Sequence, residues 1–174
     1  MPQEPRAGAR VAAGGVARAR FLAAAGRTAE AHAALDEVLA ADPDALGALQ
    51  LKAGLLLEAR DGEAALLLYE RAARAWPRSA EALNGLARGL HALGRDQAAL
   101  AAARDAQRLL GEADNFRHAA PVYLTLVWCL RELRLFKEAL AVAEEGLAVI
   151  PDAVLAQYAS LVEQELADAE KERC

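Results

Sequence analysis

The sequence predicts an all-α protein built from repeated pairs of helices. Alanine occurs 46 times and leucine 29 times among the 174 residues, and both residue types favour helices. Valine, isoleucine and threonine together number only 12, and aromatic residues make up 5% of the chain. Because strands are enriched in these residues, a substantial sheet is nearly excluded. The third observation is an internal repeat, since Pro43 and Pro77 lie 34 residues apart.

Small residues recur at the same interval as the prolines. Ala31, Ala65 and Ala99 are each separated by 34 residues. A fourth repeat begins 40 residues after the third, so we place six extra residues within 111–120. Two further series keep the 34-residue step, and three residues mark the fourth repeat: Ala19, Ala53 and Ala87; Val38, Ala72 and Ala106; and Ala139, Gly146 and Pro151.

Each period predicts two helices joined by a short turn. In the second repeat, residues 60–62 interrupt the helical pattern between 46–59 and 63–76, and residues 94–96 do the same in the third. Proline ends the second helix of a pair because it has no N–H and clashes with the preceding turn. Residues that follow the prolines, Asp44, Ser79 and Asp152, are expected to cap the next helix.

The predicted domain organisation follows from these boundaries. We expect a flexible tail over 1–11 and a single domain over 12–174. An amphipathic helix over 154–172 closes the array, because its last apolar face has no further repeat to cover it. The four repeats cover about 12–45, 46–79, 80–113 and 120–153.

This pattern of recurring alanine, glycine and proline residues resembles that of the tetratricopeptide-repeat (TPR) family over about residues 12–153. The second repeat is the clearest, with Ala65, Tyr69 and Pro77 in step with the family pattern. Gly15 departs from the pattern, since the family usually has a large apolar residue there, and Gly111 replaces the terminal proline of the third repeat. The resemblance implies a right-handed α-solenoid. It also implies that the first helix of each pair lines a concave groove that binds extended or helical peptides.

Transferring that groove onto this chain identifies candidate contact residues. We expect Trp128 and Arg88 to be the anchors, because tryptophan and arginine dominate binding hot spots. The alternative is that Trp128 is partly core and Arg88 pairs with Glu58. The set of Lys, Asn and Arg with which some TPR proteins grip a C-terminal carboxylate is mostly absent. The full candidate set is Arg20, Gln50, Leu51, Leu57, Glu58, Asn84, Arg88, His91, Leu124, Trp128, Arg131 and Tyr158.

Catalytic and metal-binding motifs are missing from the sequence. It contains no G-x-S-x-G, G-x-G-x-x-G, P-loop or H-E-x-x-H pattern. Cys129 and Cys174 lie far apart, and the three histidines fall in three different repeats. We therefore expect no enzyme, no cofactor, no metal and no disulfide framework, and the unpaired thiols suit a cytoplasmic location.

These observations favour a non-catalytic scaffold or adaptor that binds a partner peptide or protein in its groove. A net charge of −5 argues against nucleic acid as the partner, and no apolar run is long enough to insert into a membrane. Two alternatives remain open: a self-associating module, for example a homodimer, or an accessory chaperone for a secreted or envelope protein. The richness in alanine and arginine hints at a bacterial source.

Overall fold

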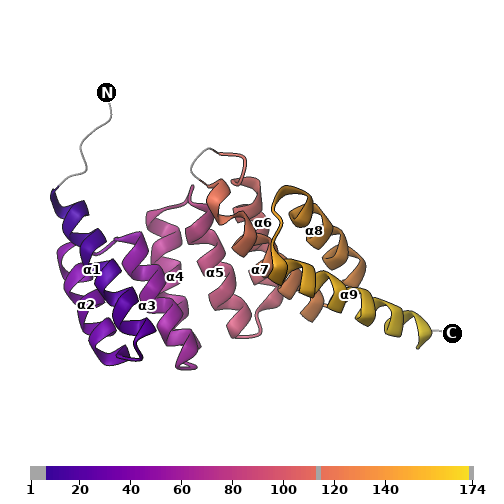
Figure 1. Cartoon of the computed structure of the whole chain (residues 1–174), viewed down its shortest axis with the longest axis horizontal. Coiled ribbons are helices and arrows are strands. Elements are labelled where there is room, and N and C mark those ends of the chain that lie inside the picture. Colours follow the sequence, from indigo (N-terminus) through magenta and orange to yellow (C-terminus); the bar gives the residue numbers. More distant parts are fainter. Residues whose placement is uncertain (1–6, 113–114, 173–174) are drawn as a thin grey trace. The chain divides into compact units, whose positions relative to one another are not determined.

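The computed structural model describes residues 7–112 and 115–172, and for residues 7–12 it describes the backbone alone. Within these ranges it contains nine α-helices, one short 3-10 helix and no strand (Figure 1). The predicted all-α fold is confirmed. No helix in this part of the chain combines the length and apolar character needed to cross a membrane. Packing divides the chain after Pro77 into two compact units, which we describe separately.

The first unit contains two helix pairs. They are α1 (Ala7–Ala24) with α2 (Thr28–Ala41), and α3 (Leu46–Glu58) with α4 (Gly62–Ala75). Each helix packs against its pair mate, and α3 also packs against α1 and α2. The first repeat begins earlier than predicted, because α1 already includes residues 7–11, which we expected in the tail.

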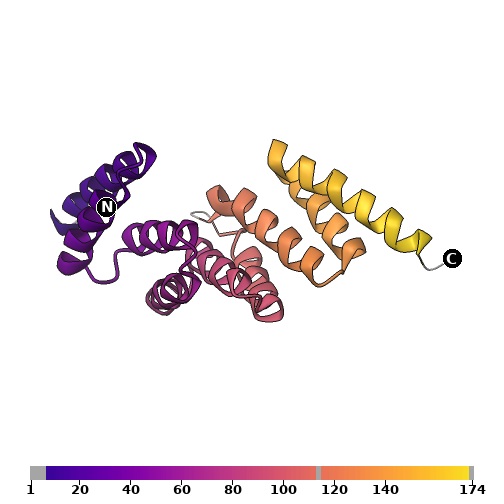
Figure 2. The same ribbon diagram turned by 90° about the horizontal axis from the view of Figure 1, so that it is seen from below.

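The second unit contains two further pairs and a closing helix. Within it α5 packs on α6 and α7, while α9 packs on both α8 and α7. Figure 2 shows α8 and α9 lying side by side. The predicted closing helix is therefore present. The elements are α5 (Ala80–Ala92), α6 (Asp96–Arg108), the 3-10 helix η1 (Phe116–His118), α7 (Ala119–Glu132), α8 (Phe136–Val149) and α9 (Ala153–Lys171).

The small residues of the repeat occupy the helix contacts. Ala31, Ala65, Ala99 and Ala139 are each 0% exposed, one in the second helix of each pair. A methyl side chain lets two helix backbones approach closely. Protein interiors are packed so densely that even one extra methylene group changes stability. The recurrence of alanine is therefore a packing requirement rather than a bias of composition.

In the first and fourth repeats, a glycine on one helix of the pair faces a larger side chain on the other. A Cβ added at Gly15 would overlap a methyl of Val38, and one added at Gly146 would lie 2.8 Å from Cγ of Tyr123. The departure of Gly15 from the family pattern thus has a local cause, since Val38 is the largest residue of its series. The positions in register with these two pairs hold Leu49 and Ala72 in the second repeat and Leu83 and Ala106 in the third.

The turn within each pair has one recurring backbone geometry. Gly26, Arg60, Gly94 and Arg134 all have positive φ, between 58° and 74°. At each turn the N–H of the next residue donates to a carbonyl five residues back, as Asp61 N–H does to the Leu56 carbonyl at 2.9 Å. This is the left-handed helix ending that glycine favours. Two of the four turns use arginine at a position that an L-residue occupies at a cost.

The connections between pairs confirm some of the predicted caps and correct one. Ser79 and Asp152 accept hydrogen bonds from the backbone N–H groups of Ala82 (3.3 Å) and Leu155 (2.8 Å), and so cap α5 and α9. Asp44 does not cap α3. Its carboxylate instead forms an ion pair with Arg71 at 3.0 Å, because the connection places it beside α4.

The six extra residues supply a cap that the sequence did not reveal. Asn115 lies in this segment and is 7% exposed. Its Oδ1 accepts from the Ala80 N–H at 3.0 Å, and its Nδ2 donates to the Arg78 carbonyl at 3.2 Å. The inserted segment therefore closes the N-terminus of α5. Phe116 in the same segment is 52% exposed.

Candidate partner-binding surface

Three helices of the second unit present a row of aromatic side chains. These are α5, α7 and α9, the first helices of their pairs and the closing helix, and α7 contacts both of the others. The Trp128 ring stacks on His91 with centroids 6.4 Å apart and meets Tyr158 edge-on at 5.8 Å. All three side chains are half-buried. This α5–α7–α9 face brings together three of the predicted groove residues.

A cavity opens beside this aromatic row. Its volume is about 260 Å³. Leu124 and Trp128 provide apolar walls, while Arg88 and Asp152 provide charge. Leu124 and Tyr158 also pack against the core of the second unit, which holds the cavity wall in place. The complete lining is Arg88, Ala120, Pro121, Leu124, Thr125, Trp128 and Asp152.

Two buried polar atoms on this face have no hydrogen-bond partner within residues 7–112 and 115–172. They are Oδ1 of Asn84, an acceptor on α5, and Nε1 of Trp128, a donor on α7. Asn84 is only 5% exposed. An unsatisfied buried donor or acceptor costs roughly 1–3 kcal/mol, so such atoms in folded proteins need an explanation. Trp128 is partly buried, as the alternative for this residue supposed, but its N–H meets no acceptor among the described residues.

The two predicted arginines of this unit have different roles. Nε of Arg131 donates to both carboxylate oxygens of Glu165 on α9, at 2.8 and 2.9 Å. Arg131 is therefore engaged within the unit, joining α7 to α9. Arg88 and Asp152 both line the cavity, and Oδ1 of Asp152 also caps α9.

The first unit holds its own candidate residues separately. Arg20 lines a cavity of about 500 Å³ together with Val16, Leu46 and Trp76. Nε1 of Trp76 donates to the Asp44 carbonyl at 2.7 Å. Trp76 thus turns back onto the connection of its own unit. Of the other predicted residues, Leu51 and Leu57 pack against core clusters, and Gln50 and Glu58 lie on α3.

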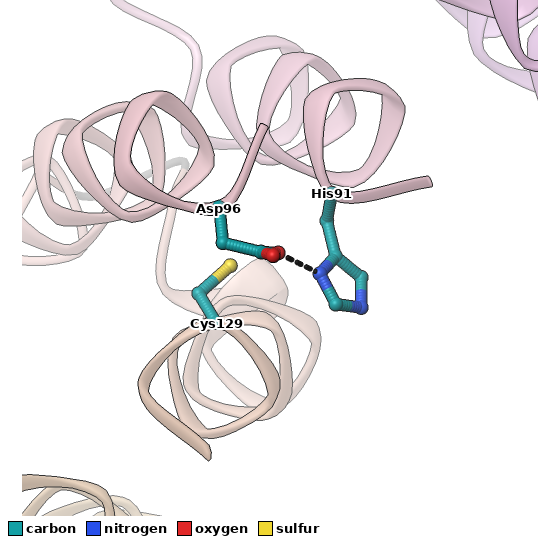
Figure 3. Close-up of side chains that lie close together, drawn as sticks. All are labelled: His91, Asp96 and Cys129. Carbon is teal, nitrogen blue, oxygen red and sulfur yellow. Dashed lines mark hydrogen bonds and ion pairs between the residues drawn. The ribbon is translucent and has the colours of Figure 1, made fainter. Parts of the chain in front are cut away.

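Sequence reasoning missed a cluster of three polar side chains. His91 lies in the last turn of α5, Asp96 begins α6, and Cys129 lies on α7, yet they converge in space (Figure 3). Nδ1 of His91 lies 2.6 Å from Oδ1 of Asp96. Burial, with a smaller contribution from the Asp96 charge, raises the pKa of the Cys129 thiol to about 12. No spacing along the chain signals this cluster, because Cys129 joins it only through the packing of α7 on the preceding pair.

One titratable side chain near the insertion has a displaced pKa. Burial lowers the pKa of His118, and the nearby Arg117 adds to the effect. Glu81, whose carboxylate lies 3.6 Å from the ring, opposes it. The neutral imidazole is therefore favoured in the folded chain.

Comparison with known proteins defines the fold but not the family. No family model and no curated protein sequence matches the chain. The PilF protein of Pseudomonas aeruginosa superposes with a TM-score of 0.78 at 16% identity, over 91% of this chain and 70% of that one. A thermophilic TPR protein of Thermus thermophilus gives 0.76 at 20% identity, over 89% and 82%. YrrB, described as a TPR protein with an unusual peptide-binding site, gives 0.62 at 20% identity, over 90% and 78%.

These likenesses span most of the chain. The expected resemblance is therefore confirmed at the level of the fold. The chain is an α-solenoid of helix-turn-helix repeats with the fold of the tetratricopeptide-repeat proteins.

Proposed function

We propose that the chain is a non-catalytic interaction module that binds an extended segment of a partner protein on the α5–α7–α9 face. The TPR fold supports a protein-interaction scaffold in general terms. The observation that carries the specific proposal is the pair of unpartnered polar atoms on that face, Asn84 Oδ1 and Trp128 Nε1.

The chemistry of the two atoms fits a peptide backbone. Asn84 offers an acceptor and Trp128 a donor, and each residue of an extended segment carries one N–H and one carbonyl. Both atoms are buried in the free chain, so binding requires side-chain rotations that bring them to the segment. When the partner's backbone forms hydrogen bonds with these two atoms, the free-energy cost of leaving them unpaired is removed. This gain in affinity does not depend on the amino-acid sequence of the segment. Side chains of the partner then determine specificity.

The cavity beside Trp128 indicates which partner side chains fit. Leu124, Pro121 and Trp128 form apolar walls, so a medium-sized apolar side chain matches the volume of about 260 Å³. Arg88 at the rim favours a carboxylate or a carbonyl oxygen nearby. The remaining candidate residues of the groove stay part of this proposal, with Arg131 assigned to holding α9 in place.

A peptide-selection experiment tests the proposal. Peptides are selected from a random library on the whole chain, and their affinity is measured by fluorescence anisotropy. We expect Trp128→Ala to weaken binding by at least about tenfold, as for a buried hot-spot residue. Trp128→Phe keeps the ring in the cavity wall but removes the N–H, and it should weaken binding several-fold.

A matched control distinguishes binding at this face from nonspecific binding to exposed apolar side chains. Leu67 lies on α4 and is 66% exposed, so Leu67→Ala removes an exposed apolar side chain elsewhere. Its affinity should equal that of the unmodified protein. If both Trp128 variants remain folded by circular dichroism and bind the selected peptides unchanged, the proposed face is wrong.

Self-association is a second candidate, favoured by the exposed side chains of the closing helix. Val154 and Leu161 are 47% and 37% exposed and lie seven residues apart, so they share one face of α9. A second copy covering that face would make a dimer. Light scattering over a range of concentrations distinguishes a dimer from a monomer, and Leu161→Glu should abolish the dimer.

A further inference from the structure

Three potential metal ligands lie together where α5, α6 and α7 meet. The ligand atoms Nδ1 of His91, a carboxylate oxygen of Asp96 and Sγ of Cys129 all lie within 4.8 Å of one another. Figure 3 shows the three side chains pointing toward a common centre from three different helices. This cluster is distinct from the cavity beside Leu124, although His91 also stacks on Trp128.

The donor set and its dimensions suit a borderline transition-metal ion. Imidazole nitrogen, carboxylate oxygen and thiolate sulfur are the three ligand types that zinc prefers. The Cys129 thiol carries a proton in the metal-free chain, and binding of the ion releases that proton to water. In a tetrahedral zinc site, neighbouring ligand atoms lie roughly 3.3–3.6 Å apart. The His91–Asp96 pair at 2.6 Å must open and the longer separations must shorten, each by about an ångström.

The backbone around the cluster is held rigidly. Arg95 N–H donates to the Leu90 carbonyl at 3.0 Å, and Gly94 has a φ of 70°, so the turn between His91 and Asp96 is well defined. Cys129 is 0% exposed, and the His91 and Asp96 side chains are 27% and 19% exposed. An ion therefore enters from the His91 and Asp96 side, where water can occupy a fourth position.

The repeat itself does not require these residues. The positions that correspond to His91 and Asp96 hold Leu57 and Gly62 in the preceding repeat and Arg131 and Phe136 in the following one. Both of those turns form with the same left-handed geometry. The polar cluster is consequently not a condition for folding a repeat of this kind.

We propose that His91, Asp96 and Cys129 form a binding site for one divalent transition-metal ion, with zinc the best match to the ligands. The ion joins the end of α5, the start of α6 and the middle of α7. It thereby holds His91 beside Trp128 on the α5–α7–α9 face.

The test uses the whole chain and the metals alone. The chain is freed of metal with a chelator and titrated with Zn²⁺ by calorimetry, and with Co²⁺ by absorption spectroscopy. We expect one ion per chain and, for cobalt, a thiolate charge-transfer band. Cys129→Ala should remove the band. Loss of a residue that only hydrogen-bonds to a metal ligand weakens binding by up to about a hundredfold. His91 is proposed as a ligand itself, so His91→Gln should weaken binding by at least that factor.

Matched controls exclude binding elsewhere. Cys174→Ser removes the other thiol, and His32→Gln removes a histidine of the first unit, so both variants should bind as the unmodified protein does. Asp96→Asn provides a second test of the site should Cys129→Ala fail to fold. Failure of the unmodified chain to bind one ion overturns the proposal, as does a charge-transfer band that persists in Cys129→Ala. No partner peptide is involved, so either result leaves the proposed peptide binding independently testable.

Discussion

The complementary sizes of Tyr123 and Gly146 give a sharp prediction about packing in the second unit. A methyl group at Gly146 would lie 2.8 Å from Cγ of Tyr123 and 2.7 Å from Cδ2 of Leu155. The leucine atom ends a flexible side chain and can rotate away. Cγ of Tyr123 cannot, because it is close to the backbone and the phenol is tied to Glu145 by a 2.8 Å hydrogen bond.

The expected magnitude follows from two opposing effects of Gly146→Ala. Overpacking a core costs roughly 1–3 kcal/mol, whereas replacing glycine by alanine inside a helix gains about 1 kcal/mol. The net change is a loss of about 1 kcal/mol in the free energy of unfolding. Gly54→Ala is the matched control, because nothing lies within 4 Å of the added methyl group. That variant should gain about 0.5–1 kcal/mol.

A double-mutant cycle isolates the contact between the two side chains. Tyr123→Leu with Gly146→Ala copies the pair Leu83 and Ala106 of the preceding repeat. We expect Gly146→Ala to be neutral or stabilising in the Tyr123→Leu background, with a coupling of about 1 kcal/mol or more. Urea denaturation followed by circular dichroism measures each variant. If Gly146→Ala costs the same in both backgrounds, the cost does not come from contact with Tyr123.

Three further predictions concern the repeat, its turns and one histidine. Ala65→Leu should cost roughly 1–3 kcal/mol, because Ala65 is 0% exposed at a helix contact; an unchanged melting temperature would contradict its placement. Arg60→Gly should raise the free energy of unfolding by up to about 1 kcal/mol, since φ at this position is 61°, and denaturant titration checks it. Burial lowers the pKa of His118 below its ordinary value of 6.5, so the unfolded chain takes up more protons there, and the stability present above pH 6.5 falls as the pH decreases. His118→Gln should flatten that decrease in urea titrations at a series of pH values, and an unaltered slope would exclude His118 as its source.

The regular part of the fold was predictable because it rests on local rules. Proline and left-handed turn residues mark where helices end, and alanine marks where they touch, so Pro77 and Ala65 could be placed from spacing alone. Asp44 was misassigned because its carboxylate has two possible partners, the N-terminus of α3 and Arg71, and only the packed unit decides between them. The position of Trp76, which donates to the Asp44 carbonyl, likewise depends on the packed unit.

The candidate surface was predictable in outline but not in its polar detail. The family pattern pointed to Trp128 and Asn84 as inner-helix residues. Nothing along the chain indicates that both carry unpartnered polar atoms, since satisfaction of a buried group depends on every neighbour around it. The cluster around Cys129 was missed for a related reason. Its members come from three helices and share no characteristic spacing.

Peptide binding to the α5–α7–α9 face is tested by following the indole N–H of Trp128 by ¹⁵N NMR during titration with a selected peptide. We expect the Trp128 resonance to shift downfield, because its unpartnered donor gains an acceptor. The indole of Trp76 already donates to Asp44 and serves as the internal reference, with little expected change. Saturable peptide binding that leaves the Trp128 indole resonance unmoved would show that the peptide does not bind at the α5–α7–α9 face.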